Sequence, residues 1–123
     1  MIWRRDERGG GTMLMMAICV VVLLLGYAAM VISGYAIAAH RARAAADLAA
    51  LSGATTASQG GDPCSSARRN ARAHLARITS CERVGDQIDF VVSVTASVAT
   101  TVRVPGLPQR VAAVAYAGSE EVR

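Results

Sequence analysis

The sequence predicts an α+β fold: a long N-terminal transmembrane helix that continues as a stalk, then a second amphipathic helix and a small antiparallel sheet of about three strands. Three observations lead to this prediction. Residues 13–39 carry no charge, an Asp-Pro pair at 62–63 opens a helical apolar stripe, and the C-terminal third alternates between apolar and polar residues. With 123 residues, the chain has room for one small domain beside the membrane helix.

The apolar stretch at residues 13–39 is 27 residues long and has no formal charge. As a helix it would span about 40 Å, whereas the hydrocarbon core of a bilayer is roughly 30 Å thick. The apolar region of a secretory signal peptide is typically about 7–15 residues long. We therefore expect a retained membrane anchor.

The charges that flank this stretch indicate its orientation. Three arginines precede it and two follow it, which places the N-terminus in the cytoplasm. The cysteines of the C-terminal part can pair in an oxidising compartment, which favours an extracytoplasmic location for that part. We expect a cytoplasmic segment (1–12), a transmembrane helix (13–39), a helical stalk (40–57) and an extracytoplasmic α+β domain (58–123). The flanking arginines are Arg4, Arg5 and Arg8 before the stretch, and Arg41 and Arg43 after it.

Small residues within the helix could let a second helix approach closely. Ala29 and Ser33 form one pair at a spacing of four, and Gly34 and Ala38 form another. Alanine-rich membrane helices also produce such pairs by chance.

The stalk is predicted to continue to about Ala57, because it consists of strong helix formers. Asp47 is either half of a plain surface pair with Arg43 or a docking contact. One side of the stalk carries residues suited to packing against other helices: Ala38, Ala42, Ala45, Leu48 and Ala49.

The second helix should begin after the linker at residues 58–63, with Asp62 as N-cap and Pro63 as its first residue. We expect it to run to about Thr79. Its apolar stripe comprises Cys64, Ala67, Ala71, Leu75 and Ile78, and Arg68, Arg69, Arg72 and Arg77 lie off that stripe. Four arginines could follow a phosphate backbone, but no aromatic residue is interleaved for base stacking. A solvated polar face is the preferred interpretation.

The remaining residues predict strands. A short strand is expected at Ser80–Val84, then a turn at Gly85-Asp86 and a half-buried strand at Gln87–Val94. Strand character continues through 100–104, Pro105-Gly106 predicts a type II turn, and a last strand covers 110–117. The alternating apolar residues of the second strand are Ile88, Phe90, Val92 and Val94.

Cys64 and Cys81 enclose sixteen residues, and a disulfide between them would stabilise the fold by about 3 kcal/mol. A zinc site built from these cysteines and His74 lacks a fourth ligand and a zinc-type spacing. His40 and His74 show no arrangement with a nucleophile and a third, orienting group. We therefore expect no catalytic, cofactor-binding or metal site, and no small-molecule substrate.

The order of features resembles a known family. Residues 8–12 (RGGGT) run directly into the apolar helix, which exits through residues 40–51 (HRARAAADLAAL). This resembles the TadE/TadG-like Flp (tight adherence) pilus-assembly family, and is most similar to its short TadE-like subgroup of high-GC bacteria, found beside secretion and helicase genes. The two cysteines and the Ala/Val-rich last strand also fit that subgroup.

The resemblance implies a pilin-like fold and a minor pilin-like or assembly role in the cell envelope. Pilin-like members are cut by a prepilin peptidase after a Gly just before the span, which here would be Gly11, leaving Thr12 as the new N-terminus. Pilins carry a Glu five residues after the cut, whereas this chain has Met16. An uncleaved anchor that assists the secretion machinery is equally compatible.

Two functions from different classes follow. The first is a membrane-anchored structural or accessory component of a Flp/Tad-type pilus or secretion system in the bacterial cell membrane. Its partners would be the membrane and other pilin-like or assembly subunits, bound by helix packing. The second is a membrane-tethered extracellular module that binds a ligand, nucleic acid or a cell-wall polymer.

Overall fold

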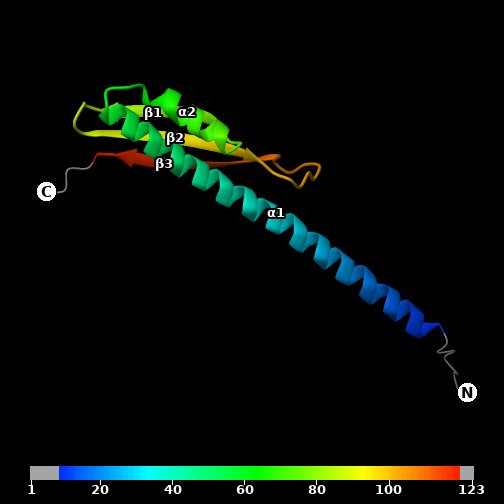
Figure 1. Cartoon of the computed structure of the whole chain (residues 1–123). Helices are drawn as coiled ribbons and strands as arrows, with labels where there is room; N and C mark the ends of the chain where they lie inside the picture. The colour runs from blue at the N-terminus through cyan, green and yellow to red at the C-terminus, as the bar shows by residue number, and fades with distance from the viewer. Residues whose placement is uncertain (1–8, 120–123) are drawn as a thin grey trace, which may run out of the picture. The chain divides into compact units, whose positions relative to one another are not determined.

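The computed structural model describes residues 9–119, which form two helices and one three-stranded sheet (Figure 1). This confirms the predicted α+β class. The arginines expected to orient the N-terminus, Arg4, Arg5 and Arg8, lie outside the described residues. The chain divides into two compact units, one ending at Ser33 and the other beginning at Gly34. The elements are α1 (Gly10–Ser58), α2 (Pro63–Ala73), β1 (Arg77–Gly85), β2 (Phe90–Ala99) and β3 (Arg110–Gly118).

Helix α1 is continuous over 49 residues and ends through a glycine cap. Gly60 adopts φ +81°, a left-handed conformation that glycine tolerates without steric cost. Its N–H donates to the carbonyl oxygen of Ala57 over 3.0 Å, and the N–H of Gly61 donates to Thr56 over 2.9 Å. This pair of bonds is a Schellman motif, which satisfies the last carbonyl groups of the helix.

Helix α2 begins as predicted and ends earlier than predicted. Asp62 is its N-cap and accepts a hydrogen bond from the backbone N–H of Cys64, with Pro63 in the first turn. The prediction that the helix reaches Thr79 is wrong. Leu75 adopts φ +57° and ends the helix, with the N–H of Ala76 donating to the carbonyl oxygen of Ala71 over 2.9 Å.

The residues after this cap belong to the sheet. Ile78 and Thr79 are β-branched and lie in β1, where Ile78 pairs with Ala96 of β2 and Thr79 falls at a register shift. The side chain of Leu75 is therefore 88% exposed instead of lying on the apolar stripe of α2. Arg77 pairs with Ser97 in the sheet, so the four arginines do not share one helix.

The sheet is antiparallel in the order β1-β2-β3, and β2 supplies most of its buried side chains. The predicted start of this strand at Gln87 is wrong. Residues 86–89 form a turn, in which the N–H of Asp86 donates to the carbonyl oxygen of Asp89. Ile88 lies in this turn and is 77% exposed. The buried residues of β2 include Phe90, Val92, Val94, Ala96 and Val98.

Residues 100–109 connect β2 to β3 as a loop, and the predicted strand character over 100–104 is absent from it. The N–H of Thr100 donates to the carbonyl oxygen of Gln109 and closes the loop. The predicted type II turn at Pro105-Gly106 is confirmed, since Gly106 adopts φ +86° and the N–H of Leu107 donates to Val104.

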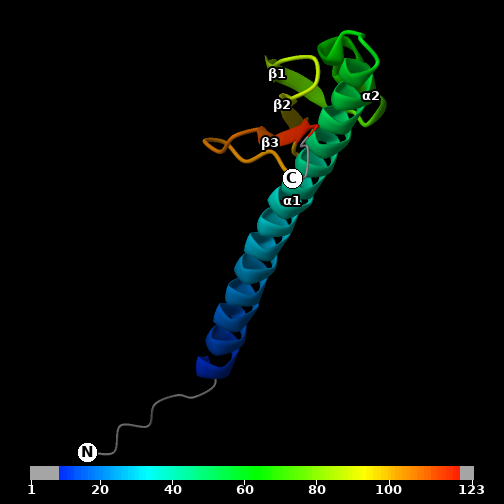
Figure 2. The ribbon, with the colours of Figure 1, turned by 90° about the vertical axis from the view of Figure 1, so that its left-hand side faces the viewer.

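Both helices contribute to one core on a single face of the sheet (Figures 1 and 2). Cys81 and Val94 are register partners, and Cys81 is bonded to α2 on this face. The opposite face carries exposed apolar side chains and no helix of the described chain. These side chains include Val84, Val91, Val114 and Tyr116.

Candidate functional site

The first part of α1, up to Ser33, exposes an apolar surface. Leu14, Leu23 and Met30 have exposed fractions of 63%, 71% and 67%, and none of the most apolar 18-residue window is buried by the rest of the chain. Soluble monomers rarely expose a contiguous apolar surface of this extent. Length and composition make α1 a candidate membrane span.

The second part of α1, from Gly34 on, is buried along one side by the same chain. A Cβ atom added at Gly53 would lie 3.1 Å from the Pro63 carbonyl oxygen and 3.3 Å from Cγ1 of Val92. Small residues are therefore required for the helix to approach α2 and β2 this closely. The buried residues are Gly34, Ala38, Ala42, Ala45, Ala46, Ala49, Ala50, Gly53 and Ala57.

This stripe contains four of the alanines that the sequence assigned to packing against other helices, but it packs on the chain's own core. The exception is Leu48, which is 42% exposed. Periodicity identified the buried side of the helix, but it carried no information about which surface covers that side.

The two pairs of small residues predicted for helix packing have different surroundings. Ala29 and Ser33 are exposed, and the Ser33 hydroxyl donates to the Ala29 carbonyl oxygen over 2.8 Å. Gly34 and Ala38 are buried by their own chain. A Cβ atom at Gly34 would lie 2.5 Å from Cγ2 of Val102. Only the first pair is open to another helix.

A hydrogen bond next to Gly34 joins α1 to the 100–109 loop. The Tyr35 hydroxyl donates to the carbonyl oxygen of Pro108 over 2.6 Å. Sequence reasoning missed this contact, because its partners are 73 residues apart and neither has a local pattern that indicates the other. It fixes the loop on α1 immediately after the exposed apolar part.

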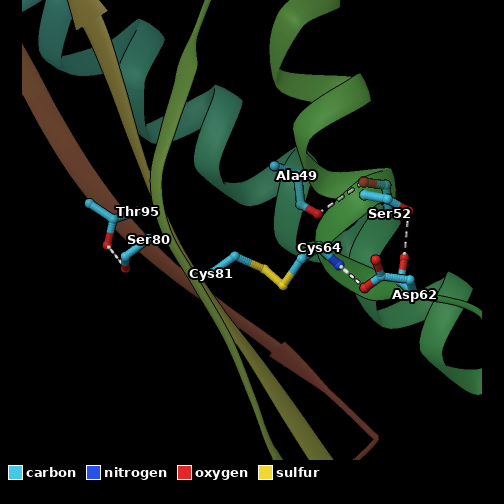
Figure 3. Close-up of a disulfide and its surroundings, with 8 residues drawn as sticks. Ala49, Ser52, Asp62, Cys64, Ser80, Cys81 and Thr95 are labelled. Carbon is cyan, nitrogen blue, oxygen red and sulfur yellow. Dashed lines mark hydrogen bonds between the residues drawn. A yellow bond between two sulfur atoms is a disulfide. The ribbon is translucent and has the colours of Figure 1, made fainter.

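The disulfide lies between α2 and β1 (Figure 3). It joins Cys64 to Cys81, whose Cα atoms are 5.8 Å apart. Ser66 at the start of α2 also donates to the carbonyl oxygen of Ser52 on α1 over 3.3 Å. Covalent and hydrogen bonds thus tie the start of α2 to both the sheet and α1.

The residues assigned to processing and docking are exposed. Gly11 and Thr12 lie in the first turn of α1, where the Thr12 hydroxyl donates to the carbonyl oxygen of Gly9 over 3.0 Å. Asp47 is exposed on α1, whereas the nearby residues Ala46 and Ala49 are buried. These positions are accessible to a partner protein.

Residues with acid–base or metal-binding chemistry are dispersed. Within residues 9–119 there is no group of three or more His, Cys, Asp or Glu side chains that could hold a metal ion. His74 is the exposed C-cap of α2. A cleft of about 450 Å³ contains His40 and Arg43 as its polar side chains, without a carboxylate or thiol to act with the imidazole. Its lining is Ala39, His40 and Arg43 of α1 and Ala112, Ala113 and Val114 of β3.

The comparison with protein families gives one match. Residues 9–57 match the family described as Flp pilus-assembly TadE/G-like. No curated protein and no solved structure matches the chain. The matched residues are almost the same as those of α1, Gly10–Ser58. Residues 9–57 therefore resemble the Flp pilus-assembly TadE/G-like family, whereas α2 and the sheet lie outside the match.

Proposed function

We propose that the chain is a membrane-anchored, minor pilin-like or accessory component of a Flp/Tad-type pilus or secretion system, and that it acts through helix packing. The single observation that carries this proposal is the coincidence of the family match with α1. The family match thus covers the helix, whereas α2 and the sheet lie outside the matched residues.

Two features of α1 support a lipid-embedded part that ends at Ser33, six residues before the end of the uncharged stretch. From Gly34 on, one side of the helix is buried by its own chain, and the 100–109 loop is attached there. Irregular backbone exposed to lipid leaves polar groups unsatisfied, at several kcal/mol each. Residues 13–33 alone would span about 31 Å as a helix, close to the roughly 30 Å of a hydrocarbon core.

The disulfide supports an extracytoplasmic location for the residues that follow the span. Disulfides persist in oxidising compartments and are rare in the cytosol. With Cys64 and Cys81 outside, the segment before α1 is cytoplasmic.

Contact with partner subunits would use the side of α1 that its own chain leaves open. In the apolar part this side includes Ala29 and Ser33, where two helices can approach closely. Beyond the membrane it includes Asp47, which offers a charged docking contact.

Exchange of the apolar part of α1 tests this mechanism. We expect a chain in which an unrelated membrane span replaces residues 13–33 to reach the membrane, to form its disulfide and to fail to restore pilus assembly or secretion in a deletion strain. Replacement of only Ala29 and Ser33 by leucine is the finer variant, with Leu23→Ala as its control. Full restoration by the unrelated span would contradict helix packing as the mechanism.

The same exchange separates the proposal from a membrane-tethered binding module. That alternative is favoured by the open face of the sheet, where Val114 and Tyr116 are 52% and 72% exposed. A binding module needs only to be tethered, so it would tolerate any span. Loss of function on substituting Tyr116, with function retained on an unrelated span, would establish the alternative.

Processing decides between a filament subunit and a permanent anchor. Cleavage between Gly11 and Thr12 would give a mature chain that begins at Thr12, in the first turn of α1. The intact mass of the protein purified from membranes distinguishes the two: loss of residues 1–11 supports a pilin-like subunit, and a full-length chain supports an accessory anchor.

A further inference from the structure

The loop at residues 100–109 is an ordered part of the fold. The N–H of Thr100 donates to the Gln109 carbonyl oxygen over 2.9 Å, and the Thr100 hydroxyl lies 3.0 Å from the carbonyl oxygen of Val102. The Thr100 side chain is 7% exposed. These contacts close the base of the loop, and the turn at Pro105-Gly106 shapes its tip.

The loop is held at the point where α1 changes from an exposed apolar helix to a buried one. Tyr35 donates to Pro108 over 2.6 Å, and the Val102 side chain lies against Gly34. Gly34 directly follows Ser33, the last residue of the part that we place in lipid. A loop fixed to Gly34 and Tyr35 is therefore at the level of the lipid headgroups.

The surface of the loop fits that level chemically. Its tip is exposed at Pro105 and Gly106, and Leu107 keeps 45% of its surface accessible. Arg103, on the approach to the tip, is also exposed. Peripheral segments that bind a bilayer surface combine exposed apolar side chains with cations, the apolar part lying below the phosphates and the cation among them.

We propose that the 100–109 loop is a second membrane contact, in which Leu107 enters the headgroup region and Arg103 binds lipid phosphate. The contact attaches residues 100–109 to a bilayer surface. This inference adds an interaction with a lipid surface to the proposed function. It rests on that function because it requires residues 13–33 to lie in lipid.

An exposed apolar residue at the other end of the sheet, Ile88, is a control for Leu107. Strand β3 begins next to the loop and ends at Gly118, a length of about 30 Å over nine residues. Gly118 is near the hairpin turn at 86–89, since its register partner Val91 follows that turn. Ile88 in this turn is 77% exposed and apolar, like Leu107, but it is remote from Tyr35.

The test is quenching of tryptophan fluorescence by brominated phosphatidylcholine in vesicles that also contain phosphatidylglycerol. The chain has one tryptophan, so Trp3→Phe provides the background. Single tryptophans are then introduced as Leu107→Trp, Pro105→Trp, Ile88→Trp and Leu23→Trp. An intact mass two hydrogens low in each variant checks that the disulfide, and hence the fold, has formed.

We expect strong quenching for Leu23→Trp, and quenching for Leu107→Trp and Pro105→Trp that exceeds Ile88→Trp by about twofold or more. When Arg103→Gln is combined with Leu107→Trp, the quenching at position 107 should decrease in vesicles that contain phosphatidylglycerol. Equal quenching at 107, 105 and 88, with Leu23→Trp quenched, would overturn the loop contact and leave the anchor intact. Absence of quenching for Leu23→Trp would overturn the anchor and the loop contact together.

Discussion

The Tyr35 hydroxyl donates a hydrogen bond of 2.6 Å to the carbonyl oxygen of Pro108, joining α1 to a loop 73 residues later in the chain. Beside it, the Val102 side chain occupies the space that a side chain at Gly34 would take. Both contacts involve α1 residues inside the 27-residue uncharged stretch. They place the end of that stretch, residues 34–39, in the folded unit.

Removal of the Tyr35 hydroxyl should loosen the loop. We expect Tyr35→Phe to lower the free energy of unfolding by about 0.5–1 kcal/mol, the net contribution of one hydrogen bond. Thermal unfolding of the detergent-solubilised protein measures the change. Tyr116→Phe, at a position that is 72% exposed on β3, is the matched control and should leave stability unchanged. Equal effects of the two substitutions would argue against a structural role for the bond to Pro108.

Substitution of Gly34 distinguishes contact with protein from contact with lipid. An added methyl group there would meet Val102, so we expect Gly34→Ala to be less stable than Gly26→Ala by about 1–3 kcal/mol. At Gly26 a Cβ atom has nothing within 4 Å. The double variant Gly34→Ala/Val102→Ala should recover most of the loss. If Gly34→Ala and Gly26→Ala behaved alike, Gly34 would not be packed against the loop.

The alanine stripe should be intolerant of larger side chains even in a single molecule. Ala46 is fully buried, so Ala46→Leu should lower the free energy of unfolding by about 1–3 kcal/mol through overpacking. Ala44, two residues earlier, is exposed, and Ala44→Leu should be close to neutral. Chemical denaturation followed by circular dichroism measures both. A stripe used only between subunits would instead give an assembly defect with normal unfolding of the monomer.

Loss of the disulfide should destabilise the folded unit by about 3 kcal/mol, because the bridge constrains the unfolded chain. Cys64→Ala and Cys81→Ala should have similar effects, and each should equal the effect of adding reductant to the wild type. Cys19→Ala, at the exposed free cysteine in the apolar part, serves as the control. Urea unfolding with and without reductant measures the differences. A reductant effect that persists in Cys64→Ala would point to another cause.

The fold was largely predictable from local patterns in the sequence. Asp62 and Pro63 marked the start of α2, and alternation identified the buried side chains Phe90, Val92 and Val94. The C-terminal end of α2 was not predictable in this way. Leu75 ends α2 in a left-handed conformation that β-carbon-bearing residues seldom adopt, so no sequence signal marked it.

Hydropathy could not predict the residue at which α1 begins to be covered by its own chain. Glycine and alanine satisfy a hydropathy criterion equally well whether lipid or protein covers them. Gly34 and Ala38 are covered by their own chain, whereas Ala29 is exposed, and only tertiary contacts such as that between Tyr35 and Pro108 separate the two cases. For the same reason, the sequence predicted that the alanine stripe is buried but did not predict which surface buries it.

Labelling of single cysteines by a membrane-impermeant maleimide on intact cells tests the central claim, that lipid covers α1 up to Ser33 and the folded unit outside begins at Gly34. Met30 and Ile37 are 67% and 54% exposed and, seven residues apart, lie on the same side of the helix. In a Cys19→Ala background, we predict that Ile37→Cys is labelled and Met30→Cys is protected. Protection of both or labelling of both would contradict a boundary between Ser33 and Gly34.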